Sequence, residues 1–392
     1  MLTSLALIFL TGLILGTLFT KLKLPALLGM IITGVILGPF ALNLLDDSIL
    51  SISSNLRQLA LVIILTRAGL AMDIDDLKRA GRPAFLMCFL PALFEITGTV
   101  LIAPKLLGIT VLEAAIIGSV IAAVSPAVVV PRMLKLIEEK RGTGKSIPQL
   151  IMAGASVDDV FVIVLFTSFL GFEKGGGLSV IKLINVPVSI VIGIITGIVI
   201  GYIMVKFFKK FHMRDSVKVV ILLSISFLLL EFEKKAGAKI PFSALIAIMS
   251  IGIGILKNYA VLAKRLSAKF SKLWVAAEIL LFVLVGATVD IKYAVAAGVL
   301  AIILIFGALI FRMTGVYFCL VGSRLNMKER VFTMMAYTPK ATVQAAIGGI
   351  PLSMGLACGE LTLTVAVLSI LVTAPLGAFA IDYSYKKFLK KE

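Results

Sequence analysis

The chain has 392 residues, of which 60% are hydrophobic and only 15% are charged, and its mean hydropathy is +1.12. This composition excludes an ordinary soluble domain and indicates a polytopic membrane protein surrounded by lipid. The net charge of +17 does not indicate a nucleic-acid partner, because the basic residues form short clusters between long apolar stretches. The three cysteines lack metal-site spacing and the single histidine lies in a basic loop, so we expect no cofactor.

The apolar segments, taken in chain order, give thirteen candidate membrane helices, since each approaches the roughly 20 residues needed to cross a bilayer. They cover residues 1–20, 25–42, 58–72, 83–104, 114–131, 149–172, 183–205, 219–231, 241–256, 273–289, 293–322, 331–351 and 361–381. The first lacks a basic leading region and a convincing cleavage site, so we interpret it as a span and not as a signal peptide. The sequence therefore predicts an all-α membrane fold in which residues 1–392 form a single polytopic unit.

The lysines and arginines test this topology, because cytoplasmic loops of membrane proteins are enriched in them. With thirteen spans, 27 of the 38 basic residues lie after odd-numbered spans, on one side of the membrane, and eight lie after even-numbered spans, on the other side. Three more, Arg67, Arg312 and Lys340, lie inside predicted spans. The asymmetry predicts a multi-pass protein of the cell (inner) membrane, with the N-terminus outside and the C-terminus in the cytoplasm.

Two predicted spans contain helix-breaking sequence. The fifth carries Ser125-Pro126 and continues to Pro131, and the twelfth carries YTPK at 337–340. Proline removes a backbone donor and clashes with the preceding turn, so both segments are expected to unwind. If the first six and last six spans form two halves joined by the seventh, the halves are inverted repeats and each break lies in the fifth helix of its half. Such a pair indicates the midplane site of a secondary transporter, although ordinary proline kinks are the alternative.

Asp158 and Asp159 are neighbours within the apolar sixth span. One aspartate at the centre of a membrane helix costs about 2.5–3.5 kcal/mol, so an adjacent pair indicates function. Consecutive helical residues point about 100° apart, so one carboxylate can face an aqueous cavity and the other a neighbouring helix. Either a proton or a small cation can neutralise such a site, but not both at once, which is the basis of exchange. The alternative is a purely structural cap or salt bridge, above all for Asp158.

Three more charged residues lie within predicted spans of the two halves. Glu95 and Arg312 are on the fourth helices of their halves, so inverted symmetry would bring them together as a buried ion pair. Lys340 lies at the second break, where it is expected to neutralise the carbonyl ends of converging half-helices. We interpret all three as supporting residues.

Together these residues resemble the cation/proton antiporters of the NapA and animal NHA type, with a more distant similarity to NhaA, over nearly the whole chain. The resemblance rests on the Asp158-Asp159 pair, on ILTRAGL at 64–70 ahead of an acidic loop, and on PKATVQAA at 339–346. It implies an NhaA-like fold of thirteen transmembrane helices, with two inverted six-helix repeats whose broken helices cross.

The resemblance also implies secondary active exchange of Na⁺ or Li⁺ for H⁺ by elevator-type alternating access. The cation would bind at Asp159, with Asp158 and the Ser125 region nearby and Thr338 as a supporting residue of the second break. NapA-type proteins commonly carry a lysine where this chain has Arg312; arginine does not release its proton, so we do not expect Arg312 to carry one. The implied assembly is a homodimer in membrane lipid. Its core transport helices would be 83–173 and 293–381, and its dimerisation or scaffold helices mainly 1–72 and 183–289.

Two other classes of protein share parts of this pattern. A sodium-coupled symporter of an organic solute would also have broken helices and inverted repeats, but it needs recognition groups for the solute inside the membrane. An intramembrane aspartyl protease needs two carboxylates that face each other, whereas neighbours on one helix diverge. We therefore expect a transporter and not an enzyme.

Overall fold

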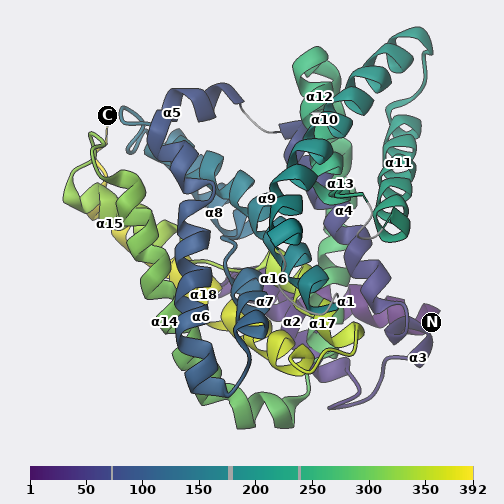
Figure 1. Ribbon diagram of the computed structural model, residues 1–392, viewed down its shortest axis with the longest axis vertical. Helices are drawn as coiled ribbons and strands as arrows, with labels where there is room; N and C mark the ends of the chain where they lie inside the picture. The colour runs from purple at the N-terminus through teal and green to yellow at the C-terminus, as the bar shows by residue number, and fades with distance from the viewer. Residues whose placement is uncertain (72–73, 175–179, 237–239, 392) are drawn as a thin grey trace. The chain divides into compact units, whose positions relative to one another are not determined.

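The computed structural model describes residues 1–71, 74–174, 180–236 and 240–391 (Figure 1). Within these ranges all regular structure is helical, apart from one isolated β-bridge between Arg141 and Lys391. The helices are α1 (Leu2–Lys21), α2 (Ala26–Leu37), α3 (Asp47–Leu50), α4 (Ser53–Ala71), α5 (Ile74–Met87), α6 (Leu90–Leu107), α7 (Val111–Ile121), α8 (Pro126–Glu138), α9 (Ile147–Lys174), α10 (Val180–Lys210), α11 (Asp215–Ala236), α12 (Ala244–Asn258), α13 (Ala260–Ala287), α14 (Ile291–Leu320), α15 (Met327–Ala336), α16 (Thr342–Ile347), α17 (Ile350–Ser353) and α18 (Gly359–Phe388).

Every predicted span overlaps at least one of these helices. In the described part of the chain, eight helical segments are long and apolar enough to cross a membrane, and α2 and α12 are shorter apolar helices. An all-helical, multi-pass membrane protein is therefore confirmed, whereas the number of thirteen crossings stays a prediction. The acidic loop expected after Leu70 begins at residues 72–73, which lie outside the described ranges.

The chain divides into two compact units. Unit 1 comprises Met1–Ser54, Asp73–Phe166 and Ile279–Glu392, and unit 2 comprises Asn55–Met72 and Thr167–Glu278. Unit 2 is built around α12, which packs closely on both α10 and α4. A side chain added at Gly201 of α10 would lie 2.6 Å from the Ile251 carbonyl oxygen, and one added at Gly252 would lie 2.6 Å from the Leu70 nitrogen. Small residues thus let these helix backbones approach one another, as is usual inside a membrane.

In the described part of unit 1, two apolar core clusters lie on either side of a polar layer. The long helix α14 passes through both: residues from Ala301 to Leu309 belong to one cluster and residues from Val316 to Leu320 to the other. Arg312 lies between the two sets and is completely buried. Helix α6 runs beside α14 (Figure 1), and its Gly98 makes room for the Phe311 ring. The fold therefore buries a charged layer midway along apolar helices.

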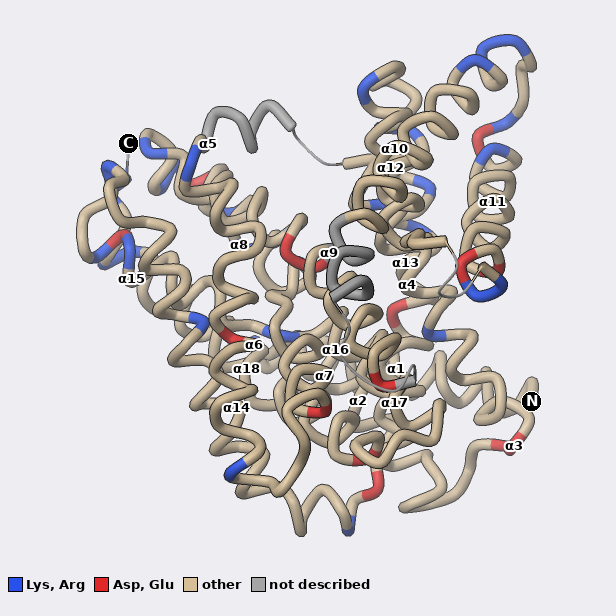
Figure 2. The backbone as a smooth tube through the Cα atoms, viewed as in Figure 1, with Lys and Arg blue, Asp and Glu red and all other residues tan. Residues whose placement is uncertain are grey.

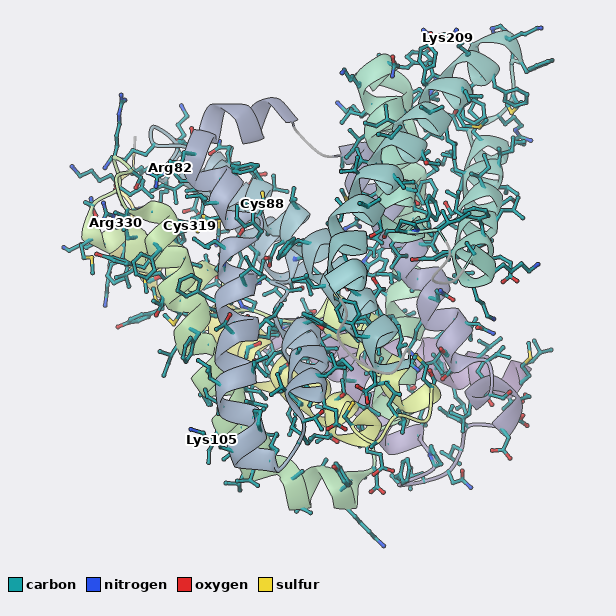
Figure 3. All side chains as sticks on the ribbon, viewed as in Figure 1. Arg82, Cys88, Lys105, Lys209, Cys319 and Arg330 are labelled. Carbon is teal, nitrogen blue, oxygen red and sulfur yellow. The ribbon has the colours of Figure 1, made fainter. Side chains whose placement is uncertain are left out.

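Charge is distributed as expected for a chain that crosses lipid. Most lysines and arginines lie towards helix ends, and the middles of the helices carry few charges (Figure 2). In unit 1, Lys105 lies at one end of α6, whereas Arg82 and Arg330 lie towards the opposite end (Figure 3). Apolar side chains such as Val299 and Ile310 of α14 are exposed, as lipid-facing side chains are.

Both broken segments have well-formed outer ends. Thr110 caps α7 and Asn326 caps α15, each in a reciprocal capping box with a glutamate three residues later. The first break is shorter than predicted: it covers residues 122–125, and α8 begins at Pro126 and continues through Pro131. Proline at the first helical position lacks only a donor that would be unpaired anyway, so Pro126 starts a helix here instead of extending the break. The second break covers residues 337–341 and includes all of the predicted YTPK run.

Candidate functional site

The two breaks contact each other through their backbones. The amide nitrogen of Ser125 donates a hydrogen bond to the Pro339 carbonyl oxygen at 2.7 Å. Ser125 is the N-cap of α8, and Pro339 lies in the second break, so this bond joins the two unwound segments directly. All residues of the site belong to unit 1.

The last carbonyl groups of α7 have no helical partner and carry the negative end of the helix dipole. Side chains from distant segments satisfy them one after another. Lys340 Nζ donates to the Ile121 carbonyl oxygen and Arg312 Nη1 donates to that of Ala122. Two cations therefore neutralise the end of a half-helix inside the apolar core.

Arg312 connects the segments of the site. Its Nη2 donates to Asp158 Oδ2 at 2.7 Å and its Nη1 to Glu95 Oε2 at 3.0 Å. Its Nε donates to the Tyr337 carbonyl oxygen of the second break at 2.7 Å. The planar guanidinium with its fixed fork of donors suits this set of acceptors, which a lysine ammonium could not bind together.

Lys340 forms the second buried ion pair. Its Nζ lies 2.6 Å from Glu95 Oε1, and both side chains are fully buried. Its backbone nitrogen donates to Thr373 Oγ1 of α18 at 3.0 Å. Glu95 thus lies between two cations, with one carboxylate oxygen facing each.

The neighbouring aspartates differ sharply in their surroundings. Asp158 is completely buried, and its Oδ2 accepts hydrogen bonds from Arg312 and, at 3.0 Å, from the Val124 nitrogen. Asp159 is 9% exposed and, among the described residues, forms no ion pair, and its Oδ1 has no hydrogen-bond partner. The helical offset between neighbours on α9 thus places one carboxylate in an ion pair and leaves the other without a cation from the described part of the chain.

The ion pairs leave one unbalanced charge at the site. Glu95, Asp158 and Asp159 are three carboxylates, whereas Arg312 and Lys340 are two cations. With all five ionised, the site carries one negative charge in excess, and Asp159 is the carboxylate without an ion-pair partner in the described part of the chain. Such a site accepts one positive charge.

The two predicted hydroxyl residues differ as well. Ser125 is buried, and its Oγ has no hydrogen-bond partner among the described residues. Thr338 is half-buried, and its Oγ1 donates to the Met335 carbonyl oxygen at 2.8 Å, within its own chain segment. Ser125 Oγ is therefore available to a ligand, whereas Thr338 closes the end of α15.

Sequence reasoning missed several groups at this site. Gln344 Nε2 donates to the Ala123 carbonyl oxygen at 2.9 Å. Tyr337 donates its hydroxyl to the Met87 carbonyl oxygen at 3.3 Å. Thr373 Oγ1 accepts from the Lys340 backbone. Only Gln344 had a usable signal, because an amide side chain inside an apolar span needs a hydrogen-bond partner; threonine and tyrosine are too common in such spans to stand out.

The chain is similar to known proteins over nearly its whole length. The model of the family "Sodium/hydrogen exchanger, transmembrane" matches residues 5–382. Sodium/hydrogen exchanger 9B2 of Homo sapiens is 33% identical over 389 residues, covering 94% of this chain and 70% of that protein. Sodium/hydrogen exchanger 9B2 of Mus musculus is 31% identical over 397 residues, covering 96% and 72%.

A solved structure has the same fold. The sodium proton antiporter MjNhaP1 from Methanocaldococcus jannaschii superposes with a TM-score of 0.86 at 19% identity, covering 99% of this chain and 98% of that chain. The family match spans nearly all of the chain, and both breaks and the five charged residues of the site lie within it. This chain therefore belongs to the family of transmembrane sodium/hydrogen exchangers.

Proposed function

We propose that this protein exchanges Na⁺ or Li⁺ for H⁺ across the membrane, and that the cation and the proton compete for Asp159. The observation that carries this proposal is the difference between the two aspartates. Asp158 is held by Arg312 at 2.7 Å, whereas Asp159, its neighbour, has no cation beside it in the described part of the chain. A buried carboxylate without a partner is expensive unless a proton or a metal ion neutralises it.

The exchange step follows from the charge of the site. Arg312 and Lys340 balance two carboxylates, so the remaining single negative charge accepts either one proton or one monovalent cation. When Asp159 binds a proton, the site loses its attraction for the cation; when the cation binds, the proton leaves to the same aqueous side. Only the neutralised site crosses the membrane, because an uncompensated charge is costly there.

We further propose the architecture that this mechanism requires. The chain would cross the membrane thirteen times as two inverted six-helix repeats, with the N-terminus outside. Support comes from the two broken helices, α7 with α8 and α15 with α16. Each begins with a capping box, and each directly follows the helix that carries one member of the Glu95–Arg312 ion pair. Residues 83–173 and 293–381 would form the core transport helices that move as an elevator, and 1–72 and 183–289 would mainly form the scaffold of a homodimer in the lipid.

Cation-induced proton release from purified protein tests the proposal. In weakly buffered detergent solution, adding Na⁺ or Li⁺ to the protonated wild type should release protons, and adding choline should not. Asp159→Asn should abolish the release. Asp158→Asn should retain a smaller release, because the carboxylate of Asp159 remains. Asp382→Asn is the matched control: Asp382 pairs with Arg132 on the surface, so its release should equal that of wild type.

Two results would refute the proposal: no cation-dependent release from the wild type, or an undiminished release from Asp159→Asn. In proteoliposomes, an imposed Na⁺ gradient should also move protons with no organic compound present. Proton movement that appeared only after an organic solute was added would instead favour the sodium-coupled symporter.

A further inference from the structure

Five backbone groups at the first break, from Ile121 to Ser125, pair with five different residues from other segments of the chain. The carbonyl oxygens of residues 121, 122 and 123 accept from Lys340, Arg312 and Gln344, and the nitrogens of residues 124 and 125 donate to Asp158 and Pro339. Four of these partners are the ion-paired residues and the crossing backbone. Gln344 is the remaining one, and it is neutral.

The chemistry of the amide fixes the orientation of Gln344. A carbonyl oxygen accepts only from a donor, so the group beside the Ala123 oxygen is the NH₂ of the side chain and not its oxygen. Gln344 is fully buried, and its Oε1 has no hydrogen-bond partner in the described ranges. A buried acceptor without a hydrogen-bond partner normally destabilises a protein, so this oxygen is expected to bind a ligand.

Three other oxygens around the same break are in the same state. Ser125 Oγ, Asp158 Oδ1 and Asp159 Oδ1 are buried and lack hydrogen-bond partners among the residues that the structure describes. Gln344 is anchored one residue from the nitrogen that binds Asp158 and two residues from Ser125, along one unwound segment. Together the four atoms are two anionic and two neutral oxygens, which is a donor set for a hard, weakly polarising cation.

We propose that Gln344 is a specificity-determining residue whose Oε1 binds the transported cation directly. This inference rests on the proposed exchange at Asp159 and adds a neutral ligand to it. The Nε2 bond to Ala123 holds the amide in place, and the oxygen contributes a dipole without changing the charge of the site. The carboxylate attracts the cation and the proton alike, whereas an amide oxygen binds the cation and accepts no proton at neutral pH. Gln344 thus favours the metal ion over the proton.

Ligand number also separates the two candidate cations. Li⁺ is smaller than Na⁺ and needs fewer oxygens, so losing one neutral ligand should weaken Na⁺ binding more than Li⁺ binding. The apparent KM values for Na⁺ and Li⁺ are therefore measured in proteoliposomes for two variants. Gln344→Met removes both the donor and the acceptor at similar size, and Gln344→Glu keeps an acceptor oxygen but loses the donor.

Gln344→Met should raise the KM for Na⁺ on the order of tenfold, raise the KM for Li⁺ less, and leave the maximal rate within about twofold. Gln344→Glu should not raise the KM for Na⁺, because its oxygen can still bind the ion. Gln149→Met is the matched control. Gln149 Oε1 is also buried without a hydrogen-bond partner in the described residues, but Gln149 precedes Asp158 by about 13 Å along α9, so this variant should leave both KM values unchanged.

Two outcomes would overturn the assignment. If both Gln344 variants raised the KM for Na⁺ equally, the role would belong to the Nε2 bond with Ala123; if the Na⁺ to Li⁺ ratio of KM in Gln344→Met stayed at the wild-type value, the role would be structural. If Gln344→Met does not fold, the ratio of the KM values for Na⁺ and Li⁺ is measured in Gln344→Asn instead. This variant keeps the amide group, but its shorter side chain moves the oxygen away from the cation. A wild type that moved no protons in response to cations would instead disprove the exchange function itself.

Discussion

Arg312→Met is the substitution whose effect the structure specifies most closely. The change keeps a long side chain and removes the guanidinium that binds Asp158, Glu95 and two backbone carbonyl oxygens. Glu95 retains Lys340, whereas the partner that Asp158 retains among the described residues is the Val124 nitrogen. The variant therefore has one fully buried carboxylate that has lost its cation.

The size of the effect follows from that unpaired charge. Removing one partner of a buried ion pair costs about 3–5 kcal/mol, mostly because the remaining charge stays buried without compensation. Neutralising the second partner should remove this cost, so the double variant Asp158→Asn/Arg312→Met should be more stable than Arg312→Met alone. Thermal unfolding of the detergent-purified proteins measures the order.

A surface pair provides the control cycle. Arg132 and Asp382 lie 3.2 Å apart with side chains 20% and 48% exposed, so their coupling should be no more than about 1 kcal/mol. Arg132→Met, Asp382→Asn and their double variant should therefore melt close to the wild type. The reasoning fails if Asp158→Asn does not rescue Arg312→Met, since that result would mean that Asp158 is not a charged partner of the arginine in the folded protein.

Three further predictions concern packing, charge movement and pH. Gly154→Ala should destabilise the protein by about 1–3 kcal/mol, because the added methyl group would clash with the Tyr337 hydroxyl. Gly171, also on α9, has open space around it, so Gly171→Ala should be neutral. Equal melting temperatures of the two variants would contradict this prediction. Exchange should be one H⁺ per Na⁺, so an imposed membrane potential should not change the rate in proteoliposomes, and a potential-dependent rate would contradict the charge balance. Burial raises the pKa of Asp215, but a hydrogen bond from Arg265 Nη2 at 2.9 Å contributes to a net lowering. The ionised carboxylate therefore stabilises the fold above about pH 4, and this effect is lost as the pH falls through the lowered pKa. The difference in melting temperature between wild type and Asp215→Asn should vanish in acid. A difference that stayed constant with pH would refute this prediction.

The membrane class and the charged members of the site were predictable from the sequence. Each ionisable residue inside an apolar run carries a visible cost, so Asp158, Asp159, Glu95, Arg312 and Lys340 stand out without any knowledge of the fold. Proline at 126 and 339 marked both breaks, because its missing donor is a property of the residue itself. The bounds of the first break were less accessible, since proline at a first helical position starts a helix as readily as it ends one.

Gln344 and Tyr337 show why the rest of the site was not predictable. Their partners are backbone carbonyl groups, which every residue has, so no residue type in the sequence marks Ala123 or Met87 as an acceptor. The need for a partner can be read from a polar side chain in an apolar span, but the partner itself cannot.

The sequence by itself determined that this chain crosses lipid as helices, that charged residues lie inside its apolar spans and that two of those spans carry helix-breaking prolines. Only the tertiary structure decided which groups pair. Arg312 lies 154 residues from Asp158 and 217 from Glu95 along the chain, and it could have paired with either aspartate as far as the sequence shows. Electrostatic energy depends on distances in space, and these arise only when α6, α9 and α14 pack around the unwound segments. That packing leaves Asp159 as the acid without an ion-pair partner in the described residues.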